Sequence, residues 1–132
     1  MENAFPKKYW FIVGGIVVAC VFIFYIKLDL PKNVTGASLG IHFEDGQIRK
    51  FEGSVESNMT ILEALYSASV VGDFEVKYFL DKDGKTNLLS IDDLINGPDK
   101  NWQAYLNDVL ISTYDLNKTK LRPGDNIVIK YE

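Results

Sequence analysis

The chain has 132 residues, of which 47% are hydrophobic, and its formal net charge is −4. Apolar residues are concentrated at the start, where they make up 21 of the first 32 residues against 41 of the remaining 100. About 100 residues are room for one domain with one core, which excludes a multidomain protein. Residues 33–132 hold 10 basic and 16 acidic side chains, a net −6, so phosphate backbones would be repelled and we predict no nucleic-acid partner.

Two residue types that often carry chemistry occur only once. Cys20 is the single cysteine, so neither an intrachain disulfide nor a thiolate zinc cluster can form. His42 is the single histidine, and a hydrolase would have to be built around it and an acidic neighbour. With no further member of a catalytic set, we predict a protein that is not an enzyme, has no metal site and has no cofactor of its own.

The N-terminal segment is typical of a membrane anchor. Residues 9–26 contain no charge and no proline, and as a helix they would span about 27 Å, close to the hydrocarbon thickness of a bilayer. Lysines flank both ends. We predict a short tail over residues 1–8, a transmembrane signal anchor over 9–28, a linker over 29–38 and a folded domain over 39–132.

A slight excess of positive charge before the anchor favours a cytoplasmic N-terminus and an extracytoplasmic domain in the cell membrane. Two alternatives stay open: cleavage as a signal peptide, and lipidation of Cys20, which ends a lipoprotein-like run of residues 17–20. Asn33, Asn58 and Asn117 begin glycosylation sequons, which matter only in a eukaryotic secretory pathway.

The first half of the domain predicts a hairpin followed by a helix. Leu39, Ile41 and Phe43 alternate with polar or small residues, and turn residues 44–47 precede a second strand over 48–55. Thr60 and Glu63 have the spacing of a capping box. The stripe that follows has the helical period and is made of Ile61, Ala64, Leu65 and Ala68. We expect a helix of about ten residues that ends at 71–73.

The second half predicts strands and tight turns. Alternation over residues 74–80 predicts a strand whose core face carries Phe74, Val76, Tyr78 and Leu80. Residues 81–84 form a turn into a strand over 86–89, and strands at 102–106 and 109–111 flank a two-residue turn. The Pro-Gly pair at 123–124 precedes a final strand that runs to the C-terminus. These elements predict an α+β fold, a β-grasp-like mixed sheet covered by one helix, with the first and last strands paired centrally.

Side chains that alternation turns away from the core are candidates for contact with a ligand or partner. Phe79 and Tyr105 are expected on the outer face, where they would form one patch. Trp102 lies on the opposite face from Tyr105, and core packing is its favoured interpretation. Asp81, Asp83 and Gly84 have the start of a calcium loop, but a hairpin turn explains them better because position twelve holds aspartate rather than glutamate.

The order and spacing of several elements in residues 57–132 resemble a known family. They are Thr60 with Ala64-Leu65, Asn96-Gly97, Trp102 with Tyr105 and Asn107, Leu121 with Pro123-Gly124-Asp125, and the closing Tyr131. The series resembles the uncharacterised bacterial surface-domain family related to the C-terminal domain of transcobalamin. That resemblance implies a β-grasp of the soluble-ligand-binding type, an asparagine turn at Asn107, and cobalamin as a possible ligand.

The sequence therefore predicts a membrane-anchored, extracytoplasmic, non-catalytic binding module for a small ligand or a cell-surface partner. Its candidate contact residues are Phe79, Trp102, Tyr105 and Asn107. The alternative is a structural or assembly subunit of a cell-envelope complex.

Overall fold

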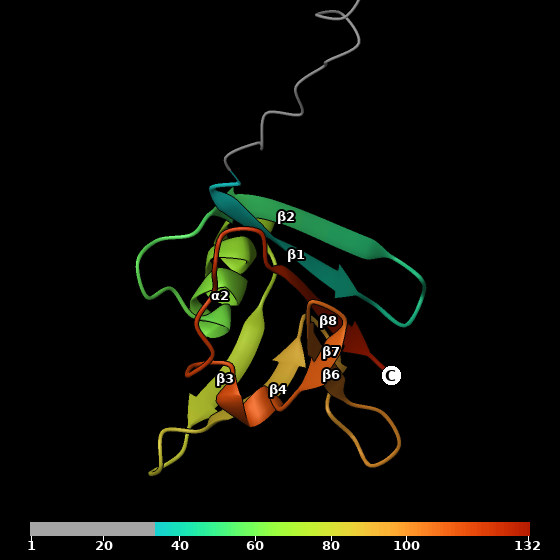
Figure 1. Cartoon of the computed structure of the whole chain (residues 1–132). Helices are drawn as coiled ribbons and strands as arrows, with labels where there is room; N and C mark the ends of the chain where they lie inside the picture. Colours follow the sequence, from blue (N-terminus) through green and yellow to red (C-terminus); the bar gives the residue numbers. More distant parts are fainter. Residues whose placement is uncertain (1–33) are drawn as a thin grey trace, which may run out of the picture. The chain divides into compact units, whose positions relative to one another are not determined.

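The structure is a computed structural model that describes residues 34–132 (Figure 1). The predicted tail, the predicted anchor and the first half of the predicted linker lie outside the described residues. Within residues 34–132, no helix has the length and apolar character needed to span a membrane.

A five-stranded sheet forms the main layer, in the order β2-β1-β8-β6-β7. Its strands are β1 (Gly36–His42), β2 (Ile48–Ser54), β6 (Trp102–Leu106), β7 (Val109–Ile111) and β8 (Asn126–Tyr131). β1 pairs antiparallel with β2 and parallel with β8, so the first strand lies beside the last in the interior of the sheet. The predicted central pairing of these two strands is confirmed.

A second sheet of three strands, in the order β3-β4-β5, accompanies the first. Its strands are β3 (Val76–Leu80), β4 (Thr86–Ile91) and β5 (Leu94–Ile95). The prediction of a single sheet is therefore wrong. In the five-stranded sheet, β8 pairs with β1 on one side and with β6 on the other, and β7 pairs with the remaining side of β6. Because these strands occupy both sides of β8 and of β6, the strands β3, β4 and β5 pair with one another instead. The fold is a mixed α+β arrangement of two sheets and one helix.

The helix α2 (Ile61–Gly72) has the predicted N-terminal signature. The Glu63 backbone N–H donates to Thr60 Oγ1 at 3.3 Å, and the Thr60 N–H donates to a Glu63 carboxylate oxygen at 2.7 Å. Asp73 ends the helix in the left-handed conformation, with a φ of 49°. The helix contacts both β1 and β3, and in Figure 1 it lies between the hairpin β1–β2 and β3.

The predicted turns are also present. Asn107 and Asp108 have φ angles of 51° and 65°, the left-handed values that a two-residue hairpin turn needs. Gly124 has a φ of 93°, and the Asp125 N–H donates to the Arg122 carbonyl across the Pro-Gly pair at 3.1 Å. A 3-10 helix η1 (Thr113–Asp115) follows β7.

The core lies between α2 and the two sheets. Ile41, Ile61, Leu65, Ile91, Trp102, Leu116, Ile127 and Ile129 have at most 1% of their surface exposed. The core face predicted for residues 74–80 is only half right, because Phe74, which precedes β3, is buried but Leu80 is 50% exposed. The register of β3 on β4 shifts between Lys77 and Tyr78, and this irregularity ends the row of inward-facing side chains after the half-buried Val76.

Candidate functional site

A groove of about 390 Å³ lies between α2 and the hairpin β1–β2. Its walls are mostly apolar and include Leu39, Phe51, Val55, Met59, Ala64, Ala68, Val71, Leu121 and Ile127. Leu39 and Ile127 are buried core residues, whereas Val71 is 81% exposed. The groove therefore runs from open solvent down to the core, and its volume is in the range typical of small-ligand sites.

Small residues keep the groove open. A Cβ added at Gly53 would meet no atom within 4 Å, so this position of β2 borders empty space. Ala64 and Ala68 present single methyl groups from the facing side of α2. In contrast, a Cβ at Gly72 would come within 2.7 Å of the Phe51 ring, so the helix end and that ring are in close contact. The chain is thus tightly packed around Gly72 and leaves open space beside Gly53.

The groove runs beside a free sheet edge. β2 has one neighbour, β1, among the strands of residues 34–132. Polar groups at the rim are few, and those with a charge are Lys50 and Glu52. Within the same residues, no three His, Cys, Asp or Glu side chains are grouped so that they could hold a metal ion. The chemistry that this groove offers is apolar contact with backbone hydrogen bonding at its edge.

A second hollow of about 540 Å³ lies beside β7 and η1. It is lined by Asn96, Asn101, Trp102, Gln103, Leu110, Ile111, Ser112, Thr113 and Tyr114. Its lining is more polar than that of the groove. The groove is the better candidate for a ligand with apolar surface, because apolar area supplies most of the binding energy in small-molecule sites.

Trp102 is a core residue, as favoured by its alternation. Its side chain is 1% exposed, and its indole N–H donates to the Leu94 carbonyl at 2.9 Å. The ring contacts Phe43 edge-on at 5.8 Å between centroids and Tyr131 at 5.1 Å. The Trp102 backbone N–H donates to the Asn96 side chain at 2.7 Å. The indole thereby joins the two sheets.

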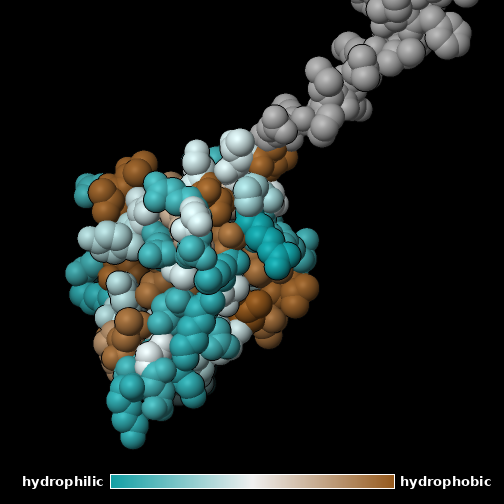
Figure 2. Space-filling model, turned by 60° about the vertical axis from the view of Figure 1, so that its left-hand side comes forward, coloured by the Kyte–Doolittle hydropathy of each residue, from teal (hydrophilic) through white to brown (hydrophobic). Residues whose placement is uncertain are grey.

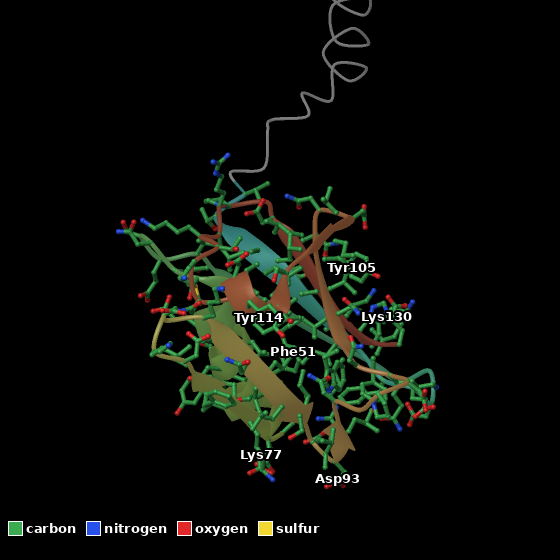
Figure 3. All side chains as sticks on the ribbon, turned by 90° about the horizontal axis from the view of Figure 1, so that it is seen from below. Phe51, Lys77, Asp93, Tyr105, Tyr114 and Lys130 are labelled. Carbon is green, nitrogen blue, oxygen red and sulfur yellow. The ribbon has the colours of Figure 1, made fainter. Side chains whose placement is uncertain are left out.

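Tyr105 lies on the face of β6 opposite Trp102 and is half-buried. Its hydroxyl donates to the Glu132 carboxylate, which also accepts a hydrogen bond from the Lys130 ammonium. Figure 3 labels Tyr105 and Lys130, which lie close together on the same side of the domain. The hydrogen bond from Lys130, followed by that from Tyr105, lowers the pKa of Glu132. The bond to Glu132 raises the pKa of both Tyr105 and Lys130. These three side chains form a small polar cluster on the sheet face away from α2.

Asn107 has a structural position in the turn between β6 and β7. Its side-chain N–H donates to the Asp125 carboxylate and its side-chain oxygen accepts from the Asn126 N–H, both at 2.9 Å. A backbone hydrogen bond from the Asn107 N–H to the Asn126 carbonyl at 2.8 Å completes the link. The asparagine turn that the family resemblance implied is present and is tied to the Gly-Asp pair before β8.

Phe79 is 50% exposed but belongs to the three-stranded sheet, whereas Tyr105 belongs to the five-stranded sheet. The predicted patch of these two rings on one sheet is not formed, because the strands of the second half divide between the two sheets. On the face seen in Figure 2, apolar side chains form several separate patches surrounded by hydrophilic ones.

The aspartate-rich turn behaves as a hairpin turn. The Asp81 carboxylate accepts the backbone N–H groups of Asp83 at 2.9 Å and Lys85 at 2.8 Å, and Gly84 has a φ of 71°. His42 is half-exposed in β1, and no side-chain hydrogen bond or ion pair within residues 34–132 involves it.

The sequence analysis did not find the groove. Gly53 inside a strand and the paired alanines Ala64 and Ala68 were the available signals, because both mark places where another group can approach closely. Neither feature of the sequence predicts that the space between Gly53 and the two alanines stays open. That depends on how far α2 stands from β2.

Comparisons with known proteins give the fold but no close relative. No protein-family model matches the chain, and no curated protein matches it. Haptocorrin in complex with Cbi has a similar structure, with a TM-score of 0.61 and 12% identity over 74% of this chain; the match spans 24% of haptocorrin. A protein from Ruminococcus gnavus ATCC 29149, to which metal binding has been attributed, gives a TM-score of 0.59 and 14% identity, covering 74% of this chain and 96% of that one. At these identities the likeness is one of fold alone.

Proposed function

We propose that this protein is a non-catalytic binding module that takes a small ligand with apolar surface into the groove between α2 and β1–β2. In this proposal the domain is a β-grasp variant that an N-terminal transmembrane signal anchor holds outside the cytoplasm. The observation that carries the binding role is the groove of about 390 Å³ with a buried apolar floor and an open mouth.

Two features support a binding role over catalysis. The groove walls hold no histidine and no cysteine, and the two charged rim residues lie on an exposed strand rather than in a buried site. Haptocorrin, which has a similar fold, forms a complex with Cbi, and that likeness is an analogy at the level of fold. Cbi is therefore a rational first probe, followed by smaller apolar compounds that match the groove volume.

The test is ligand-dependent thermal stabilisation of the full-length chain in mild detergent. A ligand at about 100 times its Kd stabilises the folded state by about 2.7 kcal/mol, which is a clear shift in melting temperature. Val71→Trp would place an indole at the groove mouth and should abolish the shift. Val70→Trp is the matched control, because Val70 is 68% exposed and does not line the groove.

Equal shifts in both variants would place the ligand elsewhere, and the second hollow beside β7 would then be the next candidate. Conversion of the ligand during the incubation would contradict the non-catalytic part of the proposal. The location is tested separately by adding protease to intact cells, where loss of the domain is expected and full protection would overturn it.

A further inference from the structure

β2 is the longest free strand edge in the described part of the chain. The edge strands of the five-stranded sheet are β2, with 7 residues, and β7, with 3. Those of the three-stranded sheet are β3, with 5 residues, and β5, with 2. β3 is interrupted by its register shift, whereas the pairing of β2 with β1 continues without a shift over all seven residues. A long regular edge is a template for another strand.

The hydrogen-bonding pattern fixes which groups of β2 face outward. The Val55 N–H donates to the Thr35 carbonyl at 3.1 Å, and the Phe43 N–H donates to the Gln47 carbonyl at 2.9 Å. Odd-numbered residues of this strand therefore point their backbone groups at β1. The N–H and C=O groups of Ile48, Lys50, Glu52 and Ser54 face the free edge.

These outward groups are self-complementary about Phe51. If a second copy of β2 pairs antiparallel with its two-fold axis at Phe51, Lys50 lies opposite Glu52 of the second copy, and Ile48 lies opposite Ser54. Every such pair joins two residues whose backbone groups face the edge, as an antiparallel ladder requires. Because of the two-fold symmetry, Lys50 of each copy lies opposite Glu52 of the other, so this register forms two cross-strand ion pairs.

The side chains on the other face of β2 also fit this register. Arg49 would lie opposite Gly53 of the second copy, where a Cβ meets no atom within 4 Å, so that the bulky side chain faces open space. The two Phe51 rings would face each other across the axis. Each Phe51 lines the groove of its own copy, so pairing brings the second copy's ring to the open side of that groove.

We propose that two copies of this chain associate through antiparallel pairing of their β2 edges, which joins their five-stranded sheets into one. This association goes beyond the ligand-binding proposal and does not depend on it. The charge pattern favours a second copy over an unrelated strand. A lysine alone on an edge discourages pairing, but Lys50 and Glu52 are both exposed, and neither takes part in a salt bridge within residues 34–132.

Charge reversal tests the register directly. The full-length chain in mild detergent is studied by sedimentation velocity over a range of concentrations. Lys50→Glu places glutamate opposite glutamate twice, and Glu52→Lys places lysine opposite lysine twice. Each single variant should raise the dimer dissociation constant about tenfold or more, because like charges directly opposite each other are destabilising.

Restoration distinguishes this register from a general effect of charge. The double variant K50E/E52K should regain the dimer, and an equimolar mixture of the two single variants should form a heterodimer, since their strands are again opposite in charge. Lys82→Glu, in the exposed turn between β3 and β4, is the matched control and should leave the dimer unchanged.

Three results would overturn the proposal. The first is a monomer at every concentration, and the second is a dimer that the single reversals do not weaken. The third is failure of both the double variant and the mixture to restore association, with all variants shown to be folded by their melting curves. Pairing of β2 with a strand of another protein would appear as the first result. A dimer held only by the N-terminal segment would appear as the second.

Discussion

The guanidinium of Arg49 on β2 lies 3.2 Å from the Asp92 carboxylate in the turn between β4 and β5, so one ion pair joins the two sheets. The same guanidinium stands 5.0 Å from the Phe43 ring centroid and 5.6 Å from that of Phe74. Asp92 also accepts the Glu75 N–H at 3.0 Å. A charged residue in an edge strand is thereby held between two aromatic rings and a carboxylate.

Arg49→Ala should lower the free energy of unfolding by about 1–2 kcal/mol, because it removes the ion pair and both cation–π contacts. Asp92→Asn should cost less, about 0.5 kcal/mol, since the pair is more than 30% exposed on each side and the amide oxygen can still accept the Glu75 N–H. Urea unfolding measures both. An equal loss in the two variants would mean that the aromatic contacts of Arg49 contribute nothing.

Asn107 should be sensitive to substitution in two separable ways. Asn107→Gly keeps the left-handed backbone but loses the two side-chain hydrogen bonds to Asp125 and Asn126, which should cost about 1–2 kcal/mol. Asn107→Ala loses those bonds and also strains the backbone at a φ of 51°, so it should cost about 1 kcal/mol more. Thermal unfolding of the two variants compares them. If alanine were as stable as glycine, the turn would have to adopt another conformation.

The two glycines beside the groove should respond in opposite ways. Gly72→Ala places a Cβ within 2.7 Å of the Phe51 ring and should destabilise the domain by about 1–3 kcal/mol. Gly53→Ala meets no atom within 4 Å, so it should be neutral or slightly stabilising, because alanine has less conformational freedom to lose on folding. The difference in urea midpoint between the variants checks this. A strongly destabilised Gly53→Ala would mean that the groove is closed in solution.

The cluster of Tyr105, Lys130 and Glu132 should make stability depend on pH at both ends of the scale. The lowered pKa of Glu132 means that its contribution is present above the unfolded pKa and is lost as the pH falls through the folded value. The raised pKa values of Tyr105 and Lys130 give contributions that are present below their unfolded values and are lost as the pH rises through the folded ones.

Glu132→Ala should return the pKa of Tyr105 toward its ordinary value of 10.0, because the acceptor of its hydroxyl is gone. NMR titration of the tyrosine ring signals measures the change, and Tyr105→Phe identifies which signal belongs to this residue. An unchanged Tyr105 titration in Glu132→Ala would contradict the hydrogen bond.

Individual elements could be predicted wherever their cause is local. The capping box of Thr60 and Glu63 spans four residues, and the turn at Asn107-Asp108 needs only two residues that tolerate positive φ. Alternation placed Trp102 and Tyr105 on opposite faces of one strand, as the structure has them. The same reasoning failed for Tyr78 and Leu80, because the register shift after Lys77 depends on the partner strand β4.

The sequence by itself determined where α2 begins, where the chain turns and which side of most strands is apolar, because these properties arise from residues a few positions apart. Only the tertiary structure decided that the second half would divide between two sheets, that Arg49 would lie between two rings, and that a groove would stay open beside Gly53. Strand pairing joins residues as distant as Ser38 and Asn126, which are 88 positions apart. Which edges meet depends on competition among all strands for the same partners, and that competition is resolved only when the whole domain packs.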